Sequence, residues 1–276
     1  MRPHAFALAT CATLGCAAIG CGGGMPLLHP ARTLPTGEVR MATGFSANVA
    51  TGGLANGLNN ARNEAATNGS NVPGPPGTDE TYARGALVAA AVAPGIAPFV
   101  AARVGTGQRY EGGIAYTGRG ARIDMRKAFD RGAWSLSIGA GGSFLFYGHQ
   151  NGGDLPNVDL GQLRGYGLDV PILAGWESAA GIYQAWFGVR GGGDHVSIEE
   201  LRSEPKTPSL GAPPISLSGT RWWGGGLAGL AIGFRHVHVA LEIDVAYVHI
   251  DGAYNATQAS VDGVTITPAS AVWVTF

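Results

Sequence analysis

The last seven residues of the chain alternate between two faces, and the same alternation recurs along most of the sequence. Val272, Val274 and Phe276 share one face of a strand, and the residues between them share the other, because strand side chains point to opposite sides in turn. The chain has 46 glycines in 276 residues and only 13% charged residues. Glycine inside a helix costs about 1 kcal/mol relative to alanine, so this composition predicts an all-β protein.

The amino-terminal end has the features of a secretory signal. Arg2 precedes residues 5–19, a short apolar stretch without acidic side chains. This stretch is too short to span a membrane as a helix, which needs about 20 apolar residues. We therefore predict a signal peptide over residues 1–20.

Ala18-Ile19-Gly20-Cys21 follows the apolar stretch and resembles the lipobox of bacterial lipoproteins. The resemblance implies that Cys21 is diacylated and becomes the new amino-terminus, although alanine stands where the lipobox usually has leucine. An ordinary signal peptide with incidental cysteines is the alternative. Residues 21–36 are then predicted to be a tether, made flexible by the glycines after Cys21. All three cysteines lie at or before position 21, so the mature chain is expected to form no internal disulfide.

Residues 37–276 contain about ten alternating segments, each about as long as the 9–11 residues of a tilted membrane strand. The predicted strands are residues 37–49, 96–104, 109–117, 120–129, 133–147, 166–176, 182–198, 220–234, 237–250 and 264–276. Long connections at 50–95, 148–163, 199–218 and 251–262 alternate with short turns at 105–108, 130–132, 178–181 and 235–236. The stretch at 50–95 is predicted to be an exposed loop, in which residues 82–94 form either a short helix, which we favour, or an additional strand. The short connection at residues 118–119 is the one exception among the outer connections. Long loops on one side and short turns on the other predict an antiparallel up-and-down transmembrane barrel.

Charged side chains lie in the middle of the predicted strands, opposite apolar ones. A soluble sandwich, tethered by lipid, is the alternative, but it would be expected to keep charges out of its strand interiors. The side chains predicted to face the lumen are Arg103, Arg109, Glu111, Arg122, Asp124, Arg126, Asp169, Glu177, Arg190, Glu242 and Asp244. Five are basic and six acidic, so we predict a charge network that closes the lumen, with a narrow selective path as the alternative.

Aromatic residues near the strand ends predict belts at the two membrane boundaries. These residues are Trp134, Tyr147, Trp176, Tyr183, Trp222, Trp223, Tyr247 and Trp273, while Trp186 is the exception and is expected in the lumen.

With its export signal, alternating strands and terminal Phe276, the chain resembles the bacterial outer-membrane β-barrel superfamily over residues 37–276. The resemblance implies a Gram-negative outer membrane, lipid as a partner, and an assembly signal at Val272, Val274 and Phe276 that is read by the barrel-assembly machinery. The fold leaves function open. A structural or surface-interaction role is expected, and a porin-like channel for small solutes or apolar compounds is the alternative.

Catalysis and nucleic-acid binding find little support in the sequence. His149, Asp194, His195, His249 and Asp251 fall near the outer strand ends, but Asp194 and His195 would point to opposite faces of one strand. A rim hydrolase is therefore a minor alternative, and no enzyme activity, cofactor or metal is expected. The net charge of -1 and the absence of a basic run argue against nucleic acid. An extracellular ligand cannot be named from the sequence.

Overall fold

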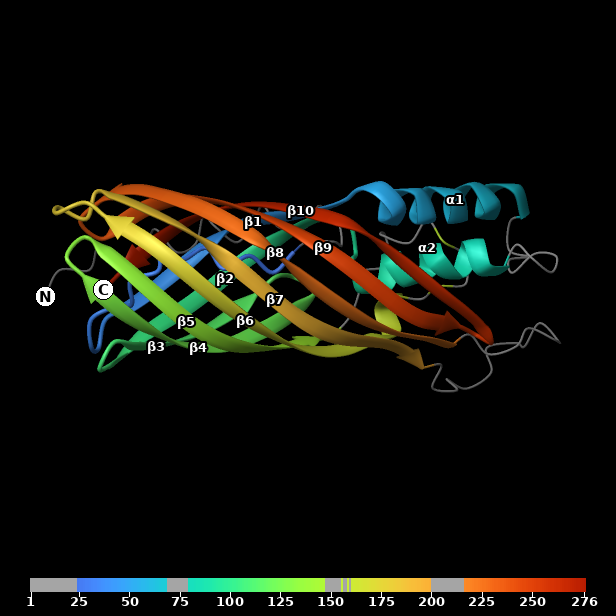
Figure 1. Ribbon diagram of the computed structural model, residues 1–276, viewed down its shortest axis with the longest axis horizontal. Coiled ribbons are helices and arrows are strands. Elements are labelled where there is room, and N and C mark those ends of the chain that lie inside the picture. The colour runs from blue at the N-terminus through green and yellow to red at the C-terminus, as the bar shows by residue number, and fades with distance from the viewer. Residues whose placement is uncertain (1–23, 69–78, 147–154, 156–157, 159, 200–215) are drawn as a thin grey trace, which may run out of the picture.

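Ten antiparallel strands close a barrel in the computed structural model, which describes residues 24–68, 79–146, 155, 158, 160–199 and 216–276. Each strand pairs with its neighbours in sequence, and β1 pairs with β10 to close the barrel (Figure 1). The strands are β1 (Val39–Ala50), β2 (Gly95–Gly107), β3 (Tyr110–Tyr116), β4 (Gly120–Arg131), β5 (Trp134–Leu145), β6 (Leu163–Glu177), β7 (Tyr183–Glu199), β8 (Ser216–Phe234), β9 (Val237–Tyr254) and β10 (Thr257–Thr275). The predicted ten-stranded antiparallel barrel is confirmed.

Alternation along the strands separates an apolar outer surface from a polar interior. On β9, the side chains from Val237 to Tyr247 with odd numbers point outward, and Leu241 among them is 50% exposed. Glu242 and Asp244 are buried on the opposite face of the same strand. Period-two alternation therefore sets which side chains can meet inside the barrel.

Short turns join the strands at the end of the barrel that lies on the left of Figure 1. At the opposite end, β9 and β10 continue to a tight turn at Asn255, whose φ of 53° is in the left-handed region. The prediction of a long loop over residues 251–262 is therefore wrong. Tyr254 pairs with Thr257, and Tyr254 and Val261 are buried. Polar outward residues such as Asp251 and Asp262 had concealed the strand pattern there. Most of the other predicted loops at 148–163 and 199–218 lie outside the described residues.

Two helices occupy the stretch that was predicted to be a long loop at 50–95. α1 (Gly52–Asn68) follows β1 directly, and α2 (Asp79–Ala91) confirms the expected helix with an earlier start. Both lie at the end of the barrel opposite the short turns (Figure 1). No helix in the described ranges is long and apolar enough to cross a membrane. The correction concerns α1, a helix that burial of Leu54 and Ala61 against α2 stabilises although its glycine- and asparagine-rich sequence does not favour it.

α1 covers a strand edge that would otherwise be unpaired. β1 ends at Ala50 opposite Thr265, whereas β10 extends further to Thr257. The Thr51 amide donates to the Val264 carbonyl at 2.9 Å, and α1 begins at the next residue. A helix laid along an exposed edge blocks pairing with another chain.

α2 packs against β7–β10 at the end of the barrel opposite the short turns. Leu87 on this helix is fully buried, and its side chain lies against Gly219 of β8 and Gly252 of β9. A Cβ on Gly252 would stand 2.4 Å from the Ser218 carbonyl oxygen and 2.7 Å from Leu87 Cδ2. The two glycines therefore allow the helix to approach the sheet closely.

Gly252→Ala is expected to destabilise the protein, because the added methyl group meets the backbone of β8 and the side chain of Leu87. We expect a loss of about 1–3 kcal/mol in the free energy of unfolding, the usual range for overpacking. Urea unfolding in detergent measures it. Gly224→Ala is the matched control, because a Cβ there meets nothing within 4 Å. Equal unfolding midpoints for the two variants would contradict the close packing of α2.

Candidate functional site

An uninterrupted chain of alternating charges crosses the lumen from β4 to β7. Its members, in order of contact, are Arg126, Glu111, Arg103, Asp124, Arg122, Asp169 and Arg190. Each of its three carboxylates contacts two guanidinium groups. Asp169, for example, accepts from Arg122 Nε at 2.8 Å and from Arg190 Nε at 2.8 Å. All seven side chains are buried, and the attraction between opposite charges offsets the free-energy cost of removing them from water.

The described part of the predicted tether lies inside the barrel rather than outside it. We call residues 24–34 the lumen segment. Its backbone forms hydrogen bonds with charged side chains that also take part in the chain of ion pairs. Arg126 donates to the carbonyls of Pro30 and, at 3.1 Å, Arg32. Glu111 accepts the Leu34 amide at 2.8 Å. A segment without regular secondary structure thus finds partners for its backbone groups.

Glu242 holds the middle of the lumen segment without help from an arginine. Its carboxylate accepts the backbone amides of Leu27 at 2.7 Å and Leu28 at 2.9 Å. The indole of Trp186 donates to the same carboxylate at 2.8 Å. Three N–H donors therefore solvate this buried acid in place of water.

Apolar side chains surround the lumen segment toward the end with short turns. Leu27, Leu28 and Ala31 pack in one buried cluster with Trp186 and Trp273. Trp186 lies in the lumen, as expected. Trp273 was predicted in an aromatic belt, and this is wrong: it is fully buried and stacks on His238 with 5.8 Å between ring centroids. Trp273 is at an inward-facing position of β10, so its side chain points into the lumen even though it lies near the end of the strand.

Nine of the eleven predicted lumen charges are buried inside the barrel, and two are not. The nine are Arg103, Glu111, Arg122, Asp124, Arg126, Asp169, Arg190, Glu242 and Asp244. Arg109 is a correction: its side chain is 55% exposed in the turn after β2 and lies 3.5 Å from Asp130. Glu177 is half-buried at the same end of the barrel and pairs with Arg32 at 3.4 Å.

Four further charged residues of the lumen were missed by the sequence reasoning. Arg40 and Arg221 are at inward-facing positions of β1 and β8, so the alternation along these strands could have identified them. Arg119 lies in a short turn, where strand alternation does not apply. Asp194 was assigned to the rim instead.

The predicted rim residues do not come together as one constellation. Asp194 turns into the barrel, where Arg221 Nε at 2.9 Å and the Trp223 indole at 2.9 Å donate to it. The prediction that Trp223 lies in an aromatic belt is therefore also wrong. His195 lies beside Tyr166, with 5.6 Å between ring centroids, and His249 contacts Asp251 at 2.8 Å. His149 lies outside the described residues. Within the described ranges no group of three His, Cys, Asp or Glu side chains is arranged to hold a metal ion.

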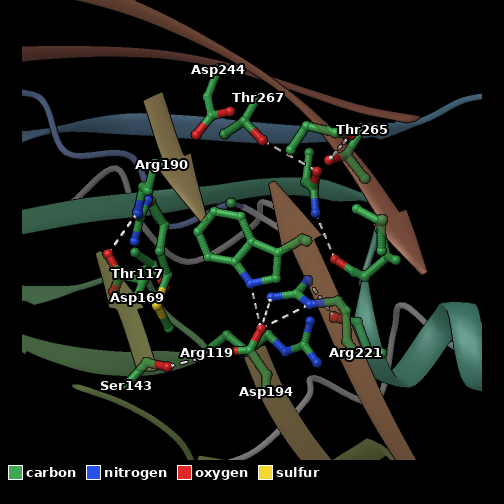
Figure 2. A pocket seen from close by; sticks show the side chains of 18 of the residues that line it. Thr117, Arg119, Ser143, Asp169, Arg190, Asp194, Arg221, Asp244, Thr265 and Thr267 are labelled. Carbon is green, nitrogen blue, oxygen red and sulfur yellow. Dashed lines mark hydrogen bonds and ion pairs between the residues drawn. The ribbon is translucent and has the colours of Figure 1, made fainter. Parts of the chain in front are cut away.

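A polar cavity of about 90 Å³ lies between the lumen segment and the end of α2. Gly24 and Met25 line it from one side, and Ala91 and Val92 from the other. Figure 2 shows Arg119, Asp194 and Arg221 around one part of this cavity and Asp244 with Thr267 across from them. We call this cavity the chamber.

The chamber walls also hold α2 in place through its last carbonyl groups. Arg119 donates to the Ala90 carbonyl, Arg221 to the Ala91 carbonyl at 2.8 Å, and Asn48 to the Val92 carbonyl at 2.6 Å. Helix carboxyl-terminal carbonyls lack partners within the helix and favour nearby cations. Barrel side chains thus cap the helix that covers them.

On the other side of the lumen segment, a wider cavity of about 700 Å³ opens among the short turns. Thr33, Leu34 and Glu38 line it together with Arg109 and His236. The lumen segment and its apolar cluster therefore separate two polar spaces.

Comparison with known proteins gives no family assignment. No family model matches the chain, and no curated protein matches it. Fourteen chains of solved structures match. Neisserial surface protein A is 10% identical with a TM-score of 0.32, covering 87% of this chain and 96% of its own. The outer membrane protein opdK from Pseudomonas aeruginosa is 9% identical with a TM-score of 0.22, covering 66% of this chain and 58% of its own. The barrel assigned to this chain is defined by its own strand pairing.

Arg126→Met is expected to destabilise the protein strongly, because Glu111 loses one of its two arginines and three carbonyls of the lumen segment lose a donor. Breaking a buried ion pair costs about 3–5 kcal/mol, to be measured as the change in unfolding free energy in urea. Arg109→Met, at an exposed arginine one strand away, is the control and should stay within about 0.5 kcal/mol. Similar losses in both variants would show that the buried chain of charges is not what stabilises the lumen.

Proposed function

We propose that this chain is an integral β-barrel of the Gram-negative outer membrane, with a closed lumen and a structural or surface-interaction role. The observation that carries the proposal is the apolar band on its outer surface. On β9 the band runs from Val237 to Tyr247 and gives way to His249 and Asp251. Ten residue steps of about 3.3 Å on a strand tilted by about 40° rise roughly 25 Å, the height of the apolar band in outer-membrane barrels.

Exposed aromatic side chains at both ends of this band support the same placement. Near the short turns they are Phe129, Trp134, Trp176, Tyr183, Phe234 and Phe276. Near the opposite end they are Tyr116, Phe144, Phe146, Tyr166, Trp222 and Tyr247. Amphipathic rings favour the boundary between hydrocarbon and water. The barrel end with the short turns is then the periplasmic end, and α1 and α2 lie outside the cell.

The proposed partners are outer-membrane lipid and the barrel-assembly machinery. Val272 and Val274 lie on the outward face of β10, and Phe276, directly after this strand, is 69% exposed beside the closing seam with β1. These three residues are therefore accessible as an assembly signal before the barrel closes.

Closure of the lumen is proposed from three successive obstructions. They are the apolar cluster around Leu27 and Leu28, the chain of ion pairs, and α2 with its capped carboxyl end. The channel alternative requires displacement of both the lumen segment and α2. No catalytic role is proposed, because Asp194 is engaged by Arg221 and Trp223 inside the barrel.

Lipidation at Cys21 remains a prediction. The position of Gly24 inside the barrel bears on whether a lipid on Cys21 reaches the membrane while the lumen segment is in place. Ser46 donates to the Gly24 carbonyl at 3.0 Å inside the barrel. Ser46 is seven residues beyond Val39, which places this contact roughly 18 Å from the periplasmic end of the barrel. Three residues span at most about 11 Å. A membrane-inserted lipid on Cys21 and a seated lumen segment are therefore competing arrangements.

Leu241→Arg places a charge on the apolar band and is expected to cost about 2–4 kcal/mol of unfolding free energy in lipid vesicles if Leu241 faces the bilayer midplane. The measurement is urea unfolding, with the heat-dependent gel shift of a closed barrel as the test of folding. Asp251→Arg is the control, since Asp251 is exposed on the same face of β9 beyond the band. An equally stable Leu241→Arg protein would remove the support for the membrane placement.

The full chain is expected to give no conductance steps in a planar lipid bilayer, because three layers of side chains obstruct the lumen. A variant lacking residues 24–34 and 79–92 is expected to conduct if it retains the heat-dependent gel shift. Ionic current steps from the full chain would favour the channel over the closed barrel.

A further inference from the structure

The chamber contains two buried charged side chains, Arg119 and Asp244, that form no ion pair with another described residue. Arg119 is 6% exposed, and its guanidinium donates to the Ala90 carbonyl, while its Nε has no hydrogen-bond partner among the described residues. Asp244 is 9% exposed, and no hydrogen bond or ion pair joins its carboxylate to the part of the chain that the structure describes. Both side chains line the same cavity.

The other charges that line the chamber are paired, so the two exceptions are specific. Asp169 contacts Arg190 at 2.8 Å, and Asp194 contacts Arg221 at 2.5 Å. An isolated buried charge costs several kcal/mol unless a partner or water solvates it. Arg119 and Asp244 are on different sides of the cavity in Figure 2, with no interaction drawn between them. They therefore do not neutralise each other directly.

A third buried polar group in the chamber points to the same conclusion. The hydroxyl of Thr117, two residues before Arg119, is buried and has no hydrogen-bond partner among the described residues. Buried polar groups are normally satisfied by protein, ordered water or ligand. A water needs about 10–15 Å³ of a cavity measured in this way, so the chamber's volume of about 90 Å³ accommodates several waters or a molecule of a few heavy atoms.

We propose that the chamber binds a small zwitterion of the α-amino-acid class, with its carboxylate at Arg119 and Thr117 and its ammonium group at Asp244. A simple anion would neutralise Arg119 but leave Asp244 without a partner, and a simple cation would do the reverse. A molecule with one charge of each sign gives each of the two side chains a partner. The limited volume restricts its side chain to hydrogen or a methyl group. Binding here is independent of whether the barrel conducts.

The test uses the full chain in detergent and radiolabelled glycine as the probe. Because the lumen segment and α2 border the chamber on both sides, glycine is supplied in two ways, during refolding and after it. Equilibrium dialysis measures the bound amount, with labelled acetate and labelled methylammonium as single-charge probes. We expect one glycine per chain, and at least tenfold weaker binding of either single-charge probe.

Asp244→Asn and Arg119→Gln are expected to weaken glycine binding at least tenfold each. The matched controls, Asp251→Asn and Arg109→Gln, change exposed residues of the same charge outside the chamber and should bind as the unchanged chain does. The heat-dependent gel shift identifies folded variants. If Arg119→Gln does not fold, the Asp244→Asn variant still decides, because it retains the α2 cap and should lose its preference for glycine over acetate.

Three results would overturn the proposal. The first is no retained glycine when the full chain refolds in its presence, which would mean that the chamber holds water only. The second is acetate binding as tight as glycine binding, which would identify a simple anion site at Arg119. The third is glycine binding that Asp244→Asn leaves unchanged.

Discussion

Neutralisation of buried charge is the constraint on which the rest of this structure depends. Ten strands enclose a lumen too narrow to hydrate every side chain, yet seven alternating charged residues cross it. Each carboxylate that lies between two arginines fixes the positions of strands that are not neighbours, as Asp169 of β6 does for β4 and β7. The middle of the interior is thus organised by ion pairs, and buried apolar clusters lie toward its two ends.

The same charges also account for the two elements that occupy the barrel. A segment without regular secondary structure, such as residues 24–34, can be buried only where its amides and carbonyls find partners. Glu242, Glu111 and Arg126 provide them. At the other end of the lumen, Arg221 and Asn48 do the same for the last carbonyls of α2. Obstruction of the lumen and solvation of its charges are therefore two effects of one set of contacts.

The barrel could be predicted from sequence because strand number and facing follow from local alternation. The errors occur where local alternation stops being informative. Trp273 has an inward phase that its closeness to a strand end concealed, and Arg109 lies in a turn with a φ of 62°, beyond the paired part of its strand. The strands at 251–262 extend beyond the apolar band, so their outward side chains are polar. In each case tertiary position decides the environment of the side chain.

The placement of the lumen segment was beyond sequence reasoning, and it has a consequence for the order of folding. Leu27 contacts Glu242 across 215 positions of sequence, one of the longest separations in the chain, and such contacts form late because the intervening chain must first be ordered. The segment is joined directly to β1, the strand whose pairing with β10 completes the wall. The barrel must therefore close around its own amino-terminal segment. Until that final pairing, the backbone from Met25 to Leu34 is open to proteases, so protection of this segment from cleavage reports completion of the barrel.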